Sequence, residues 1–267
     1  MARSTPEKPP RTFYLNEHHE LPPDEKSGGG RAPQYFGINW AAKGKRLKQS
    51  LEKAMEAALR SADPLRGRQY FLVAAPEPQL RKTSKDPKKA PSGTFEEVTD
   101  FRSSHPRVFG RLGLDLIDVA EDGRALVHAT PERLEVLLTR TSALEALNTR
   151  DQSRWATVES FSEIPVELRV DGVWLAEISG SREMVDTVFE LQPFLNRAEV
   201  EDVLRGLTEL LGRDQRSRLT GTGQDYSGRS WLRGRVSAAA IRRVAREFFS
   251  VHGMTGTGSV QALGFWQ

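Results

Sequence analysis

The chain has 267 residues, of which 37% are hydrophobic and 28% charged, and its formal net charge is only +3 although its pI is about 9.2. This length suffices for one large or two small domains, and so weak a charge imbalance does not by itself mark a nucleic-acid binder. The absence of cysteine excludes disulfides, zinc–thiolate sites and cysteine nucleophiles. With no secretory h-region and no apolar run of about 20 residues, we expect a cytoplasmic chain that does not cross a membrane.

The first 40 residues are rich in proline, glycine and charge, including Pro22-Pro23 and Gly28-Gly29-Gly30. Such a composition cannot bury enough apolar surface to offset the entropy lost on ordering. We therefore expect residues 1–40 to form an extended arm.

A helix is predicted over 41–61, because apolar residues recur at helical spacing from Leu47 to Leu59. The basic residues Lys43, Lys45, Arg46, Lys48 and Lys53 are expected on the opposite, solvated side of this helix. A nucleic-acid surface is the alternative interpretation of those side chains.

The first α/β module is expected over 41–155. A buried strand at 70–73 is followed by a long basic loop at 76–94, and two strands at 112–119 and 125–128 form a hairpin around Asp122-Gly123. Thr130 then caps a helix that begins with Pro131 and runs to about Leu147.

A second module is expected over 156–254. Asp171-Gly172 predicts a two-residue hairpin, and Asn196 with Glu199 predicts a capping box at the start of a helix. Strands at 218–222 and 230–236 precede a last helix capped by Ser237, and a short strand follows near His252. This order is that of a split βαβ unit, so we predict an α+β fold of two small ferredoxin-like, propeptide-like modules.

The tail at 255–267 is expected to bind a partner, because apolar residues in a glycine- and threonine-rich segment need a surface to pack on. The candidate partner-binding residues are Leu263, Phe265, Trp266 and Gln267 in the tail, together with Trp231 and Arg233.

No complete active site can be assembled from the motifs. The five histidines (His18, His19, His105, His128 and His252) have no metal-ligand spacing, and His128 reads as an ordinary strand residue. No Gly-x-Ser-x-Gly elbow and no phosphate-loop lysine occur. We expect a chain that is not an enzyme and needs no cofactor or metal.

The order of several segments resembles the region upstream of the protease domain in certain bacterial intracellular subtilisin-like serine peptidases, which are encoded beside an AAA ATPase. The segments are Leu21-Pro22-Pro23, the helix from Leu47 to Leu59, the strand 70–73, and the stretches 112–119, 124–134 and 155–170. The resemblance covers about 21–178, and no motif of the catalytic Asp, His and Ser is present.

The resemblance implies a non-catalytic regulatory or interaction module for a subtilisin-like protease, with that protease or the AAA ATPase as partner. It further implies a role in anti-phage defence or a toxin–antitoxin system. Subtilase propeptides resemble small split-βαβ domains that pack a sheet on the protease and lay a tail along its cleft. The alternative is a nucleic-acid-associated module that uses the basic helix 41–61 and the Arg/Trp strands at 229–236.

Overall fold

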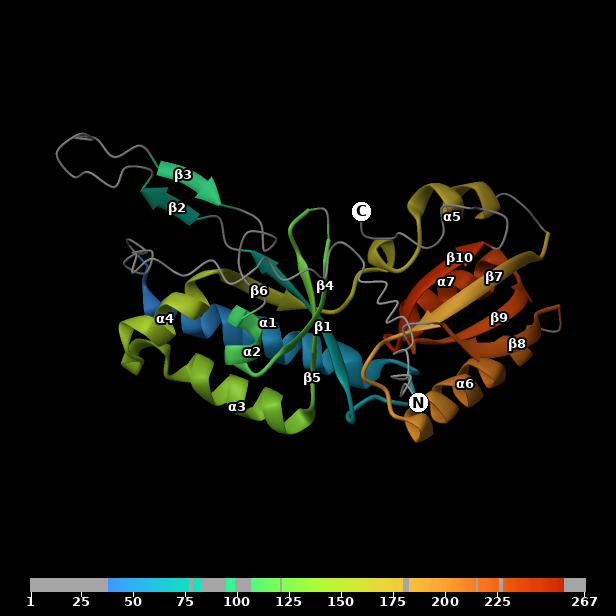
Figure 1. Cartoon of the computed structure of the whole chain (residues 1–267), viewed down its shortest axis with the longest axis horizontal. Helices are drawn as coiled ribbons and strands as arrows, with labels where there is room; N and C mark the ends of the chain where they lie inside the picture. Colours follow the sequence, from blue (N-terminus) through green and yellow to red (C-terminus); the bar gives the residue numbers. More distant parts are fainter. Residues whose placement is uncertain are drawn as a thin grey trace, which may run out of the picture. The chain divides into compact units, whose positions relative to one another are not determined.

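The computed structural model describes residues 38–76, 79–82, 95–98, 107–120, 122–179, 183–214, 216–225 and 228–256. They all fall in one compact unit, Gln34–Gln267. The fold is α+β, as predicted, with two four-stranded antiparallel sheets and one two-stranded sheet (Figure 1).

The first four-stranded sheet has the order β4-β5-β1-β6. Its strands are β1 (Tyr70–Pro76), β4 (Asp115–Val119), β5 (Ala125–Ala129) and β6 (Val158–Ser162), and every pair is antiparallel. Helix α2 (Arg107–Leu112) connects β1 to β4, and α3 (Pro131–Ser142) leads from β5 toward β6. When β1, β4, β5 and β6 are numbered 1 to 4 in chain order, they lie side by side in the order 2-3-1-4. A strand–helix–strand–strand–helix–strand unit with this order is the split βαβ arrangement.

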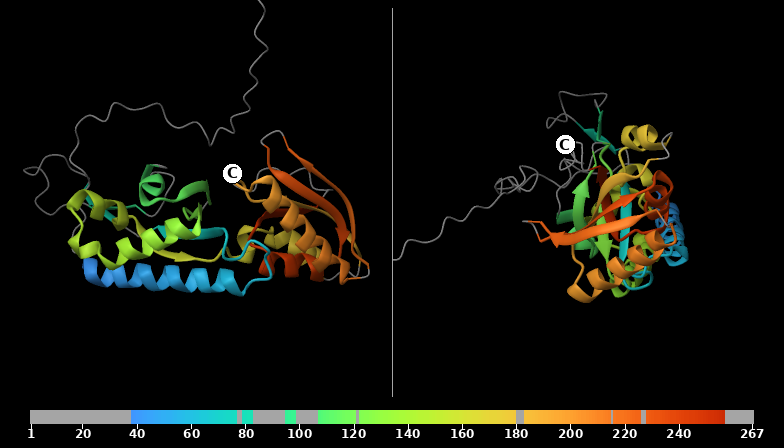
Figure 2. Two further views of the ribbon diagram at one scale, coloured as in Figure 1. Left: turned by 90° about the horizontal axis from the view of Figure 1, so that it is seen from below. Right: turned by 90° about the vertical axis from the view of Figure 1, so that its right-hand side faces the viewer.

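Helix α1 (Trp40–Arg60) packs along β6 and α3, and Figure 2 shows it beside α3. Asn39 caps it by accepting a hydrogen bond from the Ala42 amide. Gly44 permits the close approach of α1 to α3, because a Cβ atom there would collide with the carbonyl oxygen of Thr141 in α3. Lys43 was expected on the solvated face, but it is buried and its Nζ donates to the Ala156 carbonyl. Burial lowers the pKa of Lys43 to about 7.

Four smaller elements complete the first half of the described chain. The expected loop 76–94 contains strand β2 (Gln79–Lys82), which pairs with β3 (Phe95–Val98). The 3-10 turn η3 (Leu144–Ala146) and helix α4 (Thr149–Ala156) follow α3. Strand β6 pairs with β1, so this strand belongs to the first sheet although we had placed residues from 156 onward in the second module.

The second four-stranded sheet has the order β10-β7-β9-β8. Its strands are β7 (Val185–Leu191), β8 (Arg218–Gln224), β9 (Ser230–Val236) and β10 (Val251–Gly256), and its helices are α6 (Arg197–Gly212) and α7 (Ala238–Glu247). Numbered within the module, this order is 4-1-3-2, which is the order of the first sheet read from its other edge. The predicted capping box of Asn196 and Glu199 and the predicted cap by Ser237 are both confirmed.

The predicted hairpin at Asp171-Gly172 is wrong. The structure has a 3-10 turn η4 (Val166–Leu168) followed by helix α5 (Gly172–Ser179). The Asp171 carboxylate accepts hydrogen bonds from the amides of Val173 and Trp174, so it caps a helix instead of shaping a strand turn. Val170 makes an isolated bridge to Met254, which places this segment beside β10.

A buried ionic cluster ties segments of the two halves together. The Asp63 carboxylate accepts from the amides of Leu65 and Ser250 at 2.8 and 2.7 Å. Arg169 lies nearby and donates to the carbonyls of Ile164 and Phe248, each at 2.7 Å. Both side chains are almost fully buried; burial raises the pKa of the Asp63 carboxyl, and its hydrogen bonds and the charge of Arg169 oppose that rise.

Candidate docking surface

The described residues contain no group of three histidine, aspartate or glutamate side chains that could hold a metal ion. In the same part of the chain, no helix combines the length and apolarity needed to cross a bilayer. His18, His19 and His105 lie outside the described residues. The two described histidines, His128 and His252, are both buried in strands.

His128 belongs to a polar network at the junction of the two sheets, and the strand position predicted for it is confirmed. Its Nε2 lies 2.7 Å from Gln69 Oε1, and its Nδ1 lies 3.2 Å from Asp115 Oδ2. The Gln69 amide nitrogen donates to Glu199, so Gln69 Oε1 faces the imidazole. The Nε2 atom of His128 therefore carries a hydrogen and donates to Gln69. Burial lowers the pKa of His128, although Asp115 opposes this effect.

Each member of this network has its own partner. Arg133 donates to Asp115 at 2.5 Å, and Glu199 completes the capping box of α6. The ring of Phe194 stacks on His128 with a centroid distance of 5.4 Å, and Phe194 has a left-handed φ of 69°. Both ring nitrogens of His128 face acceptor oxygens, so only a protonated imidazole can donate to both, and no nucleophile lies among these contacts.

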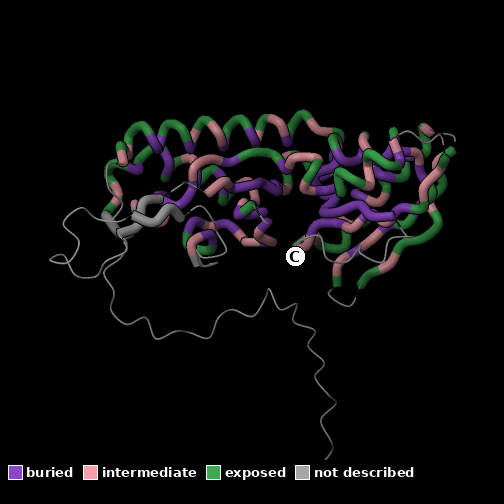
Figure 3. The backbone as a smooth tube through the Cα atoms, turned by 90° about the horizontal axis from the view of Figure 1, so that it is seen from above, coloured by how far each residue is buried: buried purple, intermediate pink, exposed green. Residues whose placement is uncertain are grey.

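The second sheet has one face covered by helices and one face that carries charge. Along β9, Ser230, Leu232, Gly234 and Val236 are buried, whereas Arg233 and Arg235 between them are exposed and Trp231 is half-buried. Figure 3 colours the whole backbone by burial. Helices α6 and α7 lie together on the side of the buried residues (Figure 2). The alternation follows from the period of two in a strand, which sends successive side chains to opposite faces.

The exposed side of β8 and β9 is basic. Arg218 of β8 lies directly opposite Arg235 of β9, and Arg233 follows two residues along on the same face. We call Arg218, Trp231, Arg233 and Arg235 the basic face. Within the part of the chain that the structure describes, none of its three guanidinium groups forms a hydrogen bond or ion pair. Like charges placed opposite each other on a sheet are destabilising, so this face is suited to a partner that supplies negative charge.

Trp231 lies against the strand next to it. A Cβ atom at Gly223, its partner on β8, would come within 2.5 Å of the indole ring. The glycine therefore lets the ring lie across β8. On the other side, Glu190 of β7 pairs with Trp231. Burial raises the pKa of the Glu190 carboxyl, while Arg229 opposes the shift and Asp225 adds to it.

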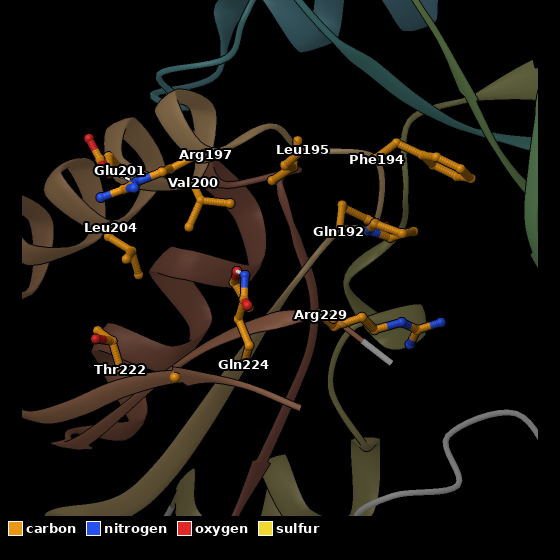
Figure 4. A pocket seen from close by; sticks show the side chains of 14 residues that line it. Gln192, Phe194, Leu195, Arg197, Val200, Glu201, Leu204, Thr222, Gln224 and Arg229 are labelled. Carbon is orange, nitrogen blue, oxygen red and sulfur yellow. Dashed lines mark hydrogen bonds and ion pairs between the residues drawn. The ribbon is translucent and has the colours of Figure 1, made fainter. Parts of the chain in front are cut away.

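A groove of about 540 Å³ lies on the helix side of the same sheet, between α6 and the β8–β9 hairpin (Figure 4). Val200 and Leu204 of α6 form an apolar wall, and Thr222 and Gln224 of β8 face them. The lining mixes apolar side chains and amides with the charged Arg197, Glu201 and Arg229.

The structure places two of the candidate partner-binding residues together. Trp231 and Arg233 lie on the same face of β9, and Arg218, which the sequence analysis did not single out, joins them through the strand register. The other four candidates, Leu263, Phe265, Trp266 and Gln267, lie outside the described residues. The period of two in Trp231, Arg233 and Arg235 indicates their shared face, whereas Arg218 requires the pairing itself.

Comparisons of this chain with protein-family models, with curated proteins and with solved structures find no match.

Proposed function

We propose that this chain is a non-catalytic module that docks on a subtilisin-like serine protease and regulates it. The observation that carries the proposal is the second module, a complete 4-1-3-2 split βαβ sheet with both helices on one side and a solvent-exposed side at β8 and β9. Subtilase propeptides resemble such domains and pack their sheet on the protease. The resemblance of the upstream segments to the non-catalytic region of these peptidases points to the same partner.

The location of the last strand supports the same function. In the propeptide-like arrangement, the segment that follows the fourth strand extends along the cleft of the protease and can add a strand at its edge. Strand β10 ends at Gly256, and the sequence continues with 257–267, which contains the apolar Leu263, Phe265 and Trp266. We propose a cytoplasmic, bacterial setting such as anti-phage defence, in which an AAA ATPase is a further partner.

The experiment combines the full chain with a subtilisin-like protease, taken from the neighbouring open reading frame where that frame encodes one. We expect a complex in gel filtration and slower cleavage of a chromogenic peptide. A chain ended after Gly256 keeps every described strand, so it tests the tail without removing part of the sheet. Inhibition that is unchanged by this truncation contradicts a tail in the cleft, and the absence of any complex with the full chain contradicts the proposed function.

A second candidate function is binding of single-stranded nucleic acid through the same sheet. The specific observation in its favour is Trp231 lying across β8 beside Arg233, because a strand-borne aromatic ring flanked by arginines can stack a base. Lys43 is buried, so one basic side chain of the helix predicted over 41–61 cannot contribute to this binding. Binding of fluorescent oligo(dT) that weakens steeply with salt favours this candidate, and no binding at low salt contradicts it.

A further inference from the structure

The spacing of charges on the basic face is compatible with the side of a helix. Arg233 and Arg235 are two residues apart on one strand, which separates them by about 6.7 Å. Acidic residues at positions i and i+4 of an α-helix are separated by about 6 Å along its axis. Arg218 lies opposite Arg235, with Cβ atoms of such pairs about 5 Å apart, so the row is two arginines wide at one end.

The same face also carries acidic groups on the neighbouring strand. Asp186 of β7 lies opposite Arg235 and is exposed, and Glu190 lies opposite Trp231. No ion pair joins Asp186 to Arg235 in the described structure. From β7 to β8 the face therefore changes from acidic to basic.

This change of sign discriminates between two kinds of anionic partner. A nucleic-acid backbone is uniformly negative, so its phosphates would meet the exposed Asp186 as well as the arginines. A protein helix can place carboxylates against Arg218, Arg233 and Arg235 and a lysine or arginine against Asp186. Complementary patterns of this kind give specificity and fast association.

We propose that the basic face recognises a surface helix of the partner protein that carries a ridge of carboxylates at i and i+4, one against Arg233 and one between Arg218 and Arg235, flanked by a basic side chain. The ridge lies along β9, and Trp231 supplies the apolar contact at the end of the row. Arginine suits this role because its guanidinium binds a carboxylate through two parallel hydrogen bonds. The inference rests on the proposed function, since it specifies the chemistry of the docking partner.

The test uses a helical peptide so that its result does not depend on the protease. The probe is a fluorescent, alanine-rich 20-residue helix with glutamates at i and i+4 and a lysine on the adjacent ridge. A control peptide has the same composition with its glutamates spread around the helix. At low salt we expect the ridge peptide to bind the full chain at least tenfold more tightly than the control peptide, as measured by anisotropy.

Two charge-matched variants of the chain locate the binding. The triple variant R218E, R233E, R235E reverses the basic face, and K45E, K53E, R213E changes the net charge equally at exposed positions elsewhere. We expect the first to lose at least tenfold in affinity for the ridge peptide and to bind a peptide with lysines on the ridge. The second should stay within about twofold of the unmodified chain. Circular dichroism establishes that both variants fold.

Several results would overturn the inference. They are equal binding of the ridge peptide by the two variants, equal binding of both peptides by the unmodified chain, and tighter binding of oligo(dT) than of the ridge peptide. If the protease binds the unmodified chain and the R218E, R233E, R235E variant equally, the inference fails while the docking function stands. If the protease does not bind at all, the proposed function fails and the peptide result still decides the inference.

Discussion

The two four-stranded sheets have the same topology but differ in what surrounds their central strands. All residues of β5 and the first five of β1 are buried, so the first sheet is covered on both faces. In the second sheet, β9 alternates between buried and accessible residues, and β8 is largely exposed. The same arrangement thus serves as an interior layer in one module and as a surface in the other. The difference lies in the side chains, because β5 reads ALVHA and β9 reads SWLRGRV.

The strongest test of this contrast introduces one charge into each sheet. Val127 of β5 is completely buried, so Val127→Glu places a carboxylate where no partner can compensate it. We expect a loss of about 4 kcal/mol or more in the free energy of unfolding, measured by urea denaturation. Arg233→Glu on β9 is the control and should change it by less than about 0.5 kcal/mol. Similar losses in both variants would show that the outer side of β9 is covered in solution.

The next largest effect concerns the buried ionic cluster that joins the halves. Arg169→Met removes the charge beside Asp63 and leaves the carbonyls of Ile164 and Phe248 without their donor. We expect a loss of about 3–5 kcal/mol in the free energy of unfolding, which urea denaturation measures. Arg68→Met breaks an exposed ion pair with Asp202 and should cost less than about 1 kcal/mol. A small loss for Arg169→Met would mean that water reaches Asp63.

Much of the architecture could be predicted because it depends on local patterns. Helical periodicity and capping residues such as Asn196 and Ser237 act within a few positions, and strand alternation marks β9. Asp171-Gly172 misled the prediction, because an aspartate before a glycine can equally cap a helix.

The long-range features could not be predicted in this way. The contact of Asp63 with Ser250 spans 187 positions, and the pairing of Arg218 with Arg235 depends on a bulge in β8. The membership of β6 in the first sheet is likewise a matter of pairing and not of local preference. For the candidate surface, the alternation of Trp231 and Arg233 was accessible from the sequence, whereas the completed row of arginines was not.

The pH dependence of the free energy of unfolding tests whether His252 of the second sheet is buried as a neutral imidazole. Burial lowers the pKa of His252 in β10 to about 3, from an ordinary value of 6.5. The unfolded chain therefore binds a proton that the folded chain does not, and stability falls as pH decreases from about 6.5 toward 3. The contribution is about 1.4 kcal/mol per pH unit. We expect the free energy of unfolding of His252→Gln, measured by urea denaturation, to fall by about 1.4 kcal/mol less per pH unit between pH 6 and pH 4 than that of the unmodified chain. Parallel curves for the two proteins would contradict a buried neutral imidazole.

The smallest effects test how Trp231 is held on the basic face. An added methyl at Gly223 would lie within 2.5 Å of the indole, whereas one at Gly221 on the same strand would meet no atom within 4 Å. We expect Gly223→Ala to lower the free energy of unfolding by about 1–3 kcal/mol and to shift the tryptophan fluorescence. Gly221→Ala should raise it by about 0.5–1 kcal/mol, because alanine loses less backbone entropy on folding. Opposite signs at two glycines of one strand would show that the indole lies across β8 in solution. Equal responses would mean that Trp231 turns away from β8 and leaves the arginines without an apolar neighbour.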